Sequence, residues 1–132
     1  MFVLWEDYAN MPDFPNWIAA QTVGDMLRRD PHTLVNPDYF DEPTIRADLT
    51  AAGFRDVKVD RIARTARAAS ARDAAVTTVQ GSLIRTAIEA AERSRLDEAT
   101  KAVEQVMLTR FGEGSVEGEM KALIVTATKP QF

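Results

Sequence analysis

The chain opens on an apolar run, Phe2-Val3-Leu4-Trp5, with no charged side chain before Glu6. An unbroken apolar run of this length is typical of a strand covered on both faces, because a half-exposed strand alternates apolar and polar side chains. Such a strand lies inside a sheet, between two neighbours, yet only Met1 precedes this one. We therefore expect it to need a neighbouring strand that the printed sequence does not supply.

The composition indicates one folded domain spanning residues 1–132. Hydrophobic residues make up 45% of the chain and charged residues 27%, which is the balance of a soluble globular protein rather than of a disordered one. No apolar stretch approaches the roughly 20 residues of a membrane helix. The absence of cysteine excludes disulfides and thiolate chemistry and fits a cytoplasmic protein.

The charge pattern argues against nucleic-acid binding. The net charge is −4, and the basic residues are interspersed with acidic ones, whereas phosphate neutralisation needs a clustered basic face. The densest basic stretch contains Arg61, Arg64, Arg67 and Arg72. We interpret it as a solvated face.

Hydrophobic periodicity and capping residues predict three strands and five helices. The expected strands cover residues 2–5, 56–62 and 119–128, and the expected helices cover about 16–29, 42–52, 71–79, 83–91 and 96–110. Asp13, Asp41 and Ser70 are the predicted N-caps of three of these helices. Gly53 should end the second helix in the left-handed conformation.

The character of each strand predicts its place in the sheet. The last strand contains a continuous apolar run, Leu123-Ile124-Val125, and should lie in the middle. The strand at 56–62 alternates valines with Lys58 and Asp60, which is typical of an edge. We thus predict an α+β domain with a small three-stranded mixed sheet, ordered first-third-second, and with the apolar edge of the first strand open to another strand.

Several local phrases support a family resemblance. They are Tyr39-Phe40-Asp41, Ile45-Arg46-Ala47-Asp48-Leu49, Ala51-Ala52-Gly53-Phe54 followed by Val57, Ser70-Ala71-Arg72-Asp73-Ala74-Ala75, Gln80-Gly81 and the strand 122–128. In this order and spacing they resemble the C-terminal half of class I S-adenosylmethionine-dependent methyltransferases, and Phe2 to Asp7 resembles the fifth strand of that family with its acidic loop. The resemblance implies a fragment of an α/β fold and covers nearly the whole chain.

The departure from the family is equally clear. The six glycines are scattered and form no glycine-rich cofactor loop. The acidic residue that ends the family's second strand, and the first four strands of its sheet, have no counterpart. The resemblance therefore implies the half that shapes the methyl-acceptor pocket, with no cofactor on this chain alone and S-adenosylmethionine bound only if a missing half is supplied.

Candidate substrate-binding residues gather around the end of the first strand, where open α/β sheets bind ligands. They are Trp5, Glu6, Tyr8 and Trp17, and Tyr39 and Phe40 are expected to close the same pocket. The competing interpretations are an exposed acidic turn for Glu6 and an ordinary core or interface for the aromatic residues.

Catalytic and metal-binding residues are not expected on this chain. His32 is the single histidine, which argues against a metal site, and we interpret it as a solvated loop residue. Ser70 and Ser82 have no recognisable partners for nucleophilic catalysis.

Two functions of different classes remain open. The first is a methyltransferase-related module, inactive alone, whose Phe2–Trp5 strand pairs with a second copy or with a missing N-terminal half. The second is a stand-alone, dimeric α+β protein that binds a small apolar molecule among its aromatic side chains. An active enzyme with a cofactor site between subunits is less favoured, because no segment here could offer glycine-rich backbone.

Overall fold

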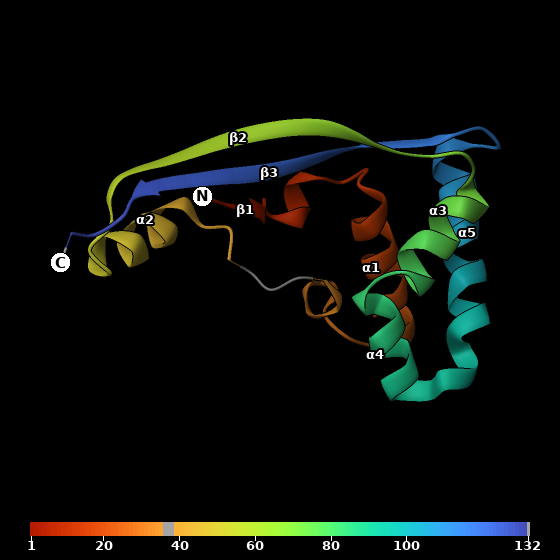
Figure 1. Cartoon of the computed structure of the whole chain (residues 1–132). Coiled ribbons are helices and arrows are strands. Elements are labelled where there is room, and N and C mark those ends of the chain that lie inside the picture. Colours follow the sequence, from red (N-terminus) through yellow and green to blue (C-terminus); the bar gives the residue numbers. More distant parts are fainter. Residues whose placement is uncertain (36–38, 132) are drawn as a thin grey trace.

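The computed structural model describes residues 1–35 and 39–131, and it contains a three-stranded sheet with helices at both ends (Figure 1). The strands are β1 (Phe2–Trp5), β2 (Arg55–Ala68) and β3 (Val116–Thr128). The α-helices are α1 (Pro15–Leu27), α2 (Glu42–Ala51), α3 (Ala71–Gln80), α4 (Leu83–Glu92) and α5 (Leu96–Phe111). Short 3-10 helices are η1 (Tyr8–Asn10), η2 (Pro31–Leu34) and η3 (Arg93–Arg95).

The sheet has the order β1-β3-β2, which confirms the predicted α+β class and strand order. Both pairings are antiparallel, so the expectation of a mixed sheet was wrong for these three strands. The central position of β3 follows from its apolar run, because Leu123 and Val125 are fully buried and a strand with a neighbour on each side can hide such residues.

The antiparallel pair of β2 and β3 is longer than predicted. Its register continues from Lys58 opposite Thr126 as far as Ala68 opposite Val116. The second half of β2 is rich in alanine and arginine, a composition with low strand propensity, so it gave little strand signal. Arg61, Arg64 and Arg67 on β2 are exposed, as expected for solvated residues, but Arg64 lies on the opposite face of the strand from Arg61 and Arg67.

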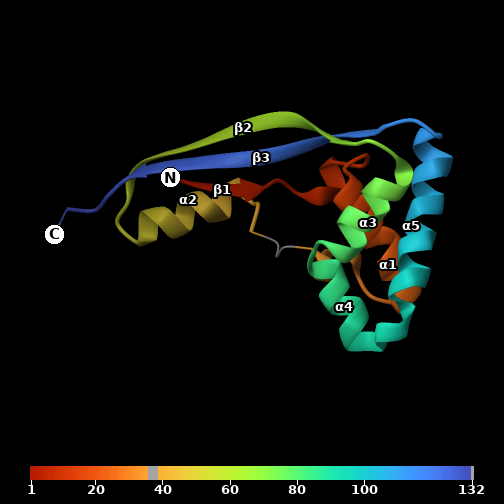
Figure 2. The ribbon, with the colours of Figure 1, turned by 45° about the vertical axis from the view of Figure 1, so that its right-hand side comes forward.

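Two separate apolar cores stabilise the fold. The larger one joins α1, α3, α4 and α5 to the beginning of β3. The smaller one consists of Ile45 of α2 and Leu123 and Val125 of β3, with half-buried Leu4, Leu49 and Val59 around them. In both ribbon views α2 lies beside the sheet and away from the other helices (Figure 1, Figure 2). Helix α2 therefore depends on its own small contact with the sheet.

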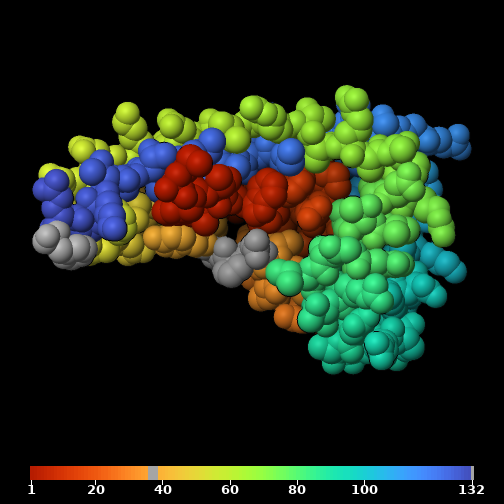
Figure 3. Space-filling view, in the orientation of Figure 1, coloured from red at the N-terminus to blue at the C-terminus, as the bar shows by residue number. Residues whose placement is uncertain are grey.

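Strand β1 lies at the edge of the sheet with much of its apolar surface exposed. Val3 is 59% exposed, and Phe2 and Trp5 are each 37% exposed. Figure 3 shows these first residues, in red, on the surface beside β3. The predicted edge position of β1 is confirmed. The described part of this chain does not cover both faces of the strand.

The hydrogen bonds of β1 identify the groups at its open edge. The backbone N–H of Glu6 donates to the carbonyl of Lys121 at 3.1 Å. Because N–H groups alternate between the two sides of an antiparallel strand, those of Val3 and Trp5 point away from β3. These groups, on an apolar strand, are available to a further strand.

The helix caps explain where the helices begin. Asp41 and Ser70 accept hydrogen bonds from the backbone N–H of Thr44 and Asp73, both at 3.1 Å, which confirms two predicted caps. The prediction for Asp13 was wrong: Phe14 is the N-cap of α1 and makes no side-chain hydrogen bond. Gly53 has a φ of 90°, the left-handed conformation expected there.

The caps lead to a first prediction. Replacing Asp41 with alanine should lower the free energy of unfolding by about 1 kcal/mol, because it removes the hydrogen bond to the first turn of α2. Asp13→Ala is the matched control: it breaks only an exposed ion pair with Arg110 at 3.5 Å and should cost less than about 0.5 kcal/mol. Urea unfolding measures both, and equal losses would contradict the capping assignment.

In the part of the chain that the structure describes, none of the helices combines the length and the apolar composition that crossing a membrane requires.

Candidate functional site

An aromatic group forms where β1 ends and η1 begins. The Trp5 ring centre lies 5.3 Å from that of Phe14 and 6.4 Å from that of Tyr8. Tyr8 also contacts Trp17, at 5.9 Å. Tyr8, Phe14 and Trp17 are buried, so most of this group belongs to the core, and Trp5 is its exposed member.

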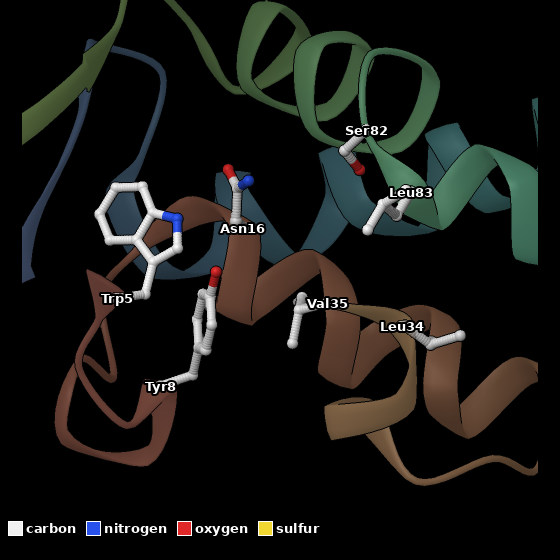
Figure 4. A pocket seen from close by; sticks show the side chains of 7 residues that line it. All are labelled: Trp5, Tyr8, Asn16, Leu34, Val35, Ser82 and Leu83. Atoms are coloured by element: carbon white, nitrogen blue, oxygen red, sulfur yellow. The ribbon is translucent and has the colours of Figure 1, made fainter. Parts of the chain in front are cut away.

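A hollow of about 200 Å³ lies beside this aromatic group (Figure 4). We call it the Trp5 pocket. The residues that line it come from β1, η1, the first turn of α1, the end of η2 and the start of α4, and they are Trp5, Tyr8, Asn16, Leu34, Val35, Ser82 and Leu83. Segments far apart in the sequence thus converge at the carboxyl end of β1.

The Trp5 pocket has a polar side and an aliphatic side. In Figure 4 the indole nitrogen of Trp5, the hydroxyl of Tyr8 and the amide of Asn16 lie on one side, and the branched side chains of Leu34 and Leu83 lie on the other. Burial raises the pKa of Tyr8 above its ordinary value of 10.0, so its hydroxyl stays neutral. The pocket therefore offers uncharged hydrogen-bonding groups next to apolar surface.

Ser82 serves the helix rather than a reaction. Its hydroxyl donates to the carbonyl of Thr78 at 2.5 Å and accepts from the N–H of Ile84 at 3.2 Å. A hydroxyl that is occupied in this way caps α4 and is poorly placed to act as a nucleophile. Ser70 likewise caps α3.

His32 has more contacts than a solvated loop residue would have. Its ring packs on Trp17, with 4.8 Å between ring centres. Nδ1 lies 3.1 Å from the Asp30 carboxylate, and Nε2 lies 3.8 Å from that of Asp7. Hydrogen bonds from His32 lower the pKa of Asp30. These contacts connect η2 to α1 and η1, and they hold Leu34 and Val35 beside the pocket.

A second hollow lies between the end of β1 and the start of α2. Its volume is about 250 Å³, and its lining includes Glu6, Phe40 and Glu42. Glu42 binds Arg61 at 2.9 Å and Arg46 at 3.0 Å, and hydrogen bonds from Arg61 and then Arg46 lower its pKa. This hollow is mainly acidic, but residues 1–35 and 39–131 contain no group of three side chains arranged to hold a metal ion.

The six predicted substrate-binding residues do not share one site. Trp5 and Tyr8 line the Trp5 pocket, whereas Glu6 and Phe40 line the acidic hollow. Trp17 is 5% exposed and packs in the core. The Tyr39 hydroxyl donates to the Asp48 carboxylate of α2 at 2.8 Å, a bond that raises the pKa of Tyr39. Tyr39 and Phe40 therefore lie apart from the aromatic pocket that they were expected to close.

Several pocket residues were missed by sequence reasoning. Asn16 and Leu83 were each assigned only as the start of a helix. Leu34 and Val35 fell in a segment interpreted as an irregular connection. The sequence contained a local signal for Asn16, because a side chain in the first turn of a helix points toward the preceding loop. Leu34, Val35 and Leu83 reach the pocket only through the packing of η2 and α4 against α1.

No family model matches the chain, and no curated protein matches it either.

Proposed function

We propose that this protein is the acceptor-side part of an S-adenosylmethionine-dependent methyltransferase and has no methyltransferase activity by itself. In this proposal β1 pairs along its open edge with a donor-binding half that carries the glycine-rich loop. The Trp5 pocket, at the carboxyl end of β1, is then the place where the methyl acceptor binds.

The observation that carries the proposal is the arrangement of the three strands. The character of each strand predicts the order first-third-second with an apolar central strand, an arrangement that resembles the C-terminal half of the methyltransferase family, and the sheet has the order β1-β3-β2 with Leu123 and Val125 buried in β3. Strands β1 and β2 run in the same direction, because each of them is antiparallel to β3. These features support the resemblance independently of the individual phrases.

The open edge of β1 supports the need for a partner. Its outward N–H groups belong to Val3 and Trp5, and its exposed side chains are apolar with no charge to discourage pairing. Natural proteins usually protect such an edge with charges, proline or cover. A strand from a second polypeptide would supply that cover.

Calorimetry with S-adenosylmethionine tests the first part of the proposal. The isolated chain should give no binding heat, because the printed sequence offers no glycine-rich backbone to the cofactor. Micromolar binding by the isolated chain would refute the proposal.

Co-expression tests the second part. A neighbouring reading frame that encodes the glycine-rich half should yield a complex that binds S-adenosylmethionine. Val3→Pro should weaken assembly of that complex, because proline removes an outward N–H without touching the bonds to β3. Val3→Ala, which keeps the N–H, is the matched control. Full assembly with Val3→Pro would contradict pairing through β1.

A second candidate function is a stand-alone binding module. The lining of the Trp5 pocket favours it, because small-molecule sites combine apolar walls with a few polar groups. In that case the isolated chain should be a dimer through β1 and should be stabilised against heat by an apolar compound. A monomer in native mass measurements, with no stabilising compound in a thermal-shift screen, would remove this candidate.

A further inference from the structure

We propose that the Trp5 pocket binds a neutral, single-ring molecule that carries one oxygen acceptor, the chemistry of a simple phenol. The oxygen would meet Trp5, Tyr8 and Asn16, and the ring would lie against Leu34, Val35 and Leu83. The binding itself needs only this chain, but calling the bound phenol the methyl acceptor rests on the proposed function.

The size of the pocket sets the size of the ligand. Its volume is about 200 Å³, and an apolar protein cavity of roughly 150 Å³ is known to hold benzene. A single ring with one or two small substituents therefore fits. A fused ring system would have to project past Leu83, which is 57% exposed at the pocket.

The lining excludes a charged ligand. All seven side chains that line the pocket are uncharged, and the carboxylates of Glu6 and Asp7 line the other hollow instead. Moving a carboxylate or an ammonium group from water into such a lining costs free energy, because the lining offers no opposite charge to pair with it. A neutral molecule avoids this cost.

The polar side of the pocket favours an oxygen acceptor. The indole N–H of Trp5 can only donate a hydrogen bond, and the raised pKa of Tyr8 keeps its hydroxyl proton in place. Two donors and an amide on one side of the pocket (Figure 4) therefore face the bound molecule.

Nuclear magnetic resonance titration of the isolated chain with three probes tests the proposal. The probes are 4-methylphenol, toluene, which lacks the oxygen, and 4-methylbenzoate, which adds a charge. We expect 4-methylphenol to bind with a Kd on the order of 1 mM and to shift the indole N–H of Trp5. Toluene should bind about threefold to tenfold more weakly, and 4-methylbenzoate should not bind measurably.

Matched variants assign the contacts. Tyr8→Phe and Asn16→Ala should each weaken 4-methylphenol about threefold to tenfold and leave toluene unchanged. Gln21→Ala, an exposed position on the same helix, should change neither. Leu83→Trp should block both probes by filling the exposed side of the pocket.

Three outcomes would overturn the proposal: no binding of 4-methylphenol, equal binding of toluene, or equal binding of 4-methylbenzoate. Its failure is distinct from failure of the proposed function. A co-expressed complex that binds S-adenosylmethionine would still support a methyltransferase if 4-methylphenol does not bind. Conversely, phenol binding by the isolated chain stands even if no donor-binding partner exists.

Discussion

Replacing Gly118 with alanine is expected to destabilise the protein by about 3 kcal/mol or more. A Cβ atom at Gly118 would overlap the carbonyl group of Asp13 and come within 3.1 Å of the backbone nitrogen of Phe14. The Asp13 segment cannot withdraw easily, because Met11 and Phe14 on either side of it are buried in the larger core. Glycine at this position of β3 is what allows one backbone to cross another.

Gly114→Ala is the matched control for Gly118→Ala. A Cβ at Gly114 meets no atom within 4 Å, so this variant should change the free energy of unfolding by less than about 1 kcal/mol. Urea unfolding followed by circular dichroism measures both variants. Similar urea midpoints for Gly118→Ala and Gly114→Ala would show that the backbone of Asp13 does not pack tightly against Gly118.

Replacing Ile45 with alanine is expected to release α2 from the sheet at a cost of about 2 to 5 kcal/mol. Ile45 is the only fully buried residue of α2 (Glu42–Ala51), and it lies in the smaller core. The remaining attachments of α2 are the half-buried Leu49, the ion pair of Glu42 with Arg61 and a hydrogen bond from Arg46 to the Val57 carbonyl. Exposed polar contacts of this kind contribute little.

Hydrogen exchange read by mass spectrometry distinguishes local from global unfolding in Ile45→Ala. Amides of α2 should exchange much faster, while those of α5 in the larger core should keep most of their protection. Thr50→Ala, at an exposed position of the same helix, should leave both segments protected. Equal loss of protection in α2 and α5 would mean that the two cores unfold as one unit.

The helices were largely predictable because their signals are local. Ser70 and Asp41 are capping residues immediately before helical periodicity, and Gly53 stands where a left-handed residue is needed. The apolar run Leu123-Ile124-Val125 likewise predicted the centre of the sheet. Such features depend on a few neighbouring residues, so a single sequence contains them.

The ends of the strands were not predictable in the same way. Residues 63–68 of β2 have little strand propensity, and pairing with residues 116–121 of β3 holds them extended. The grouping of the candidate site residues differs for a related reason: Tyr39 and Phe40 were grouped with Trp5, but the Tyr39 hydroxyl donates to Asp48 of α2 and Phe40 lines the other hollow. Both outcomes depend on contacts between residues that lie far apart in the sequence.

The sequence by itself determined the starts of α2 and α3, the α+β class and the order of the strands, because apolar runs and caps act over short distances. Only the tertiary structure decided that Asp13 crosses Gly118, that α2 has a core of its own, and that Asn16, Leu34 and Leu83 meet at one pocket. The reason is physical: these contacts arise from how whole elements pack, and packing joins residues whose separation along the chain carries no periodic signal.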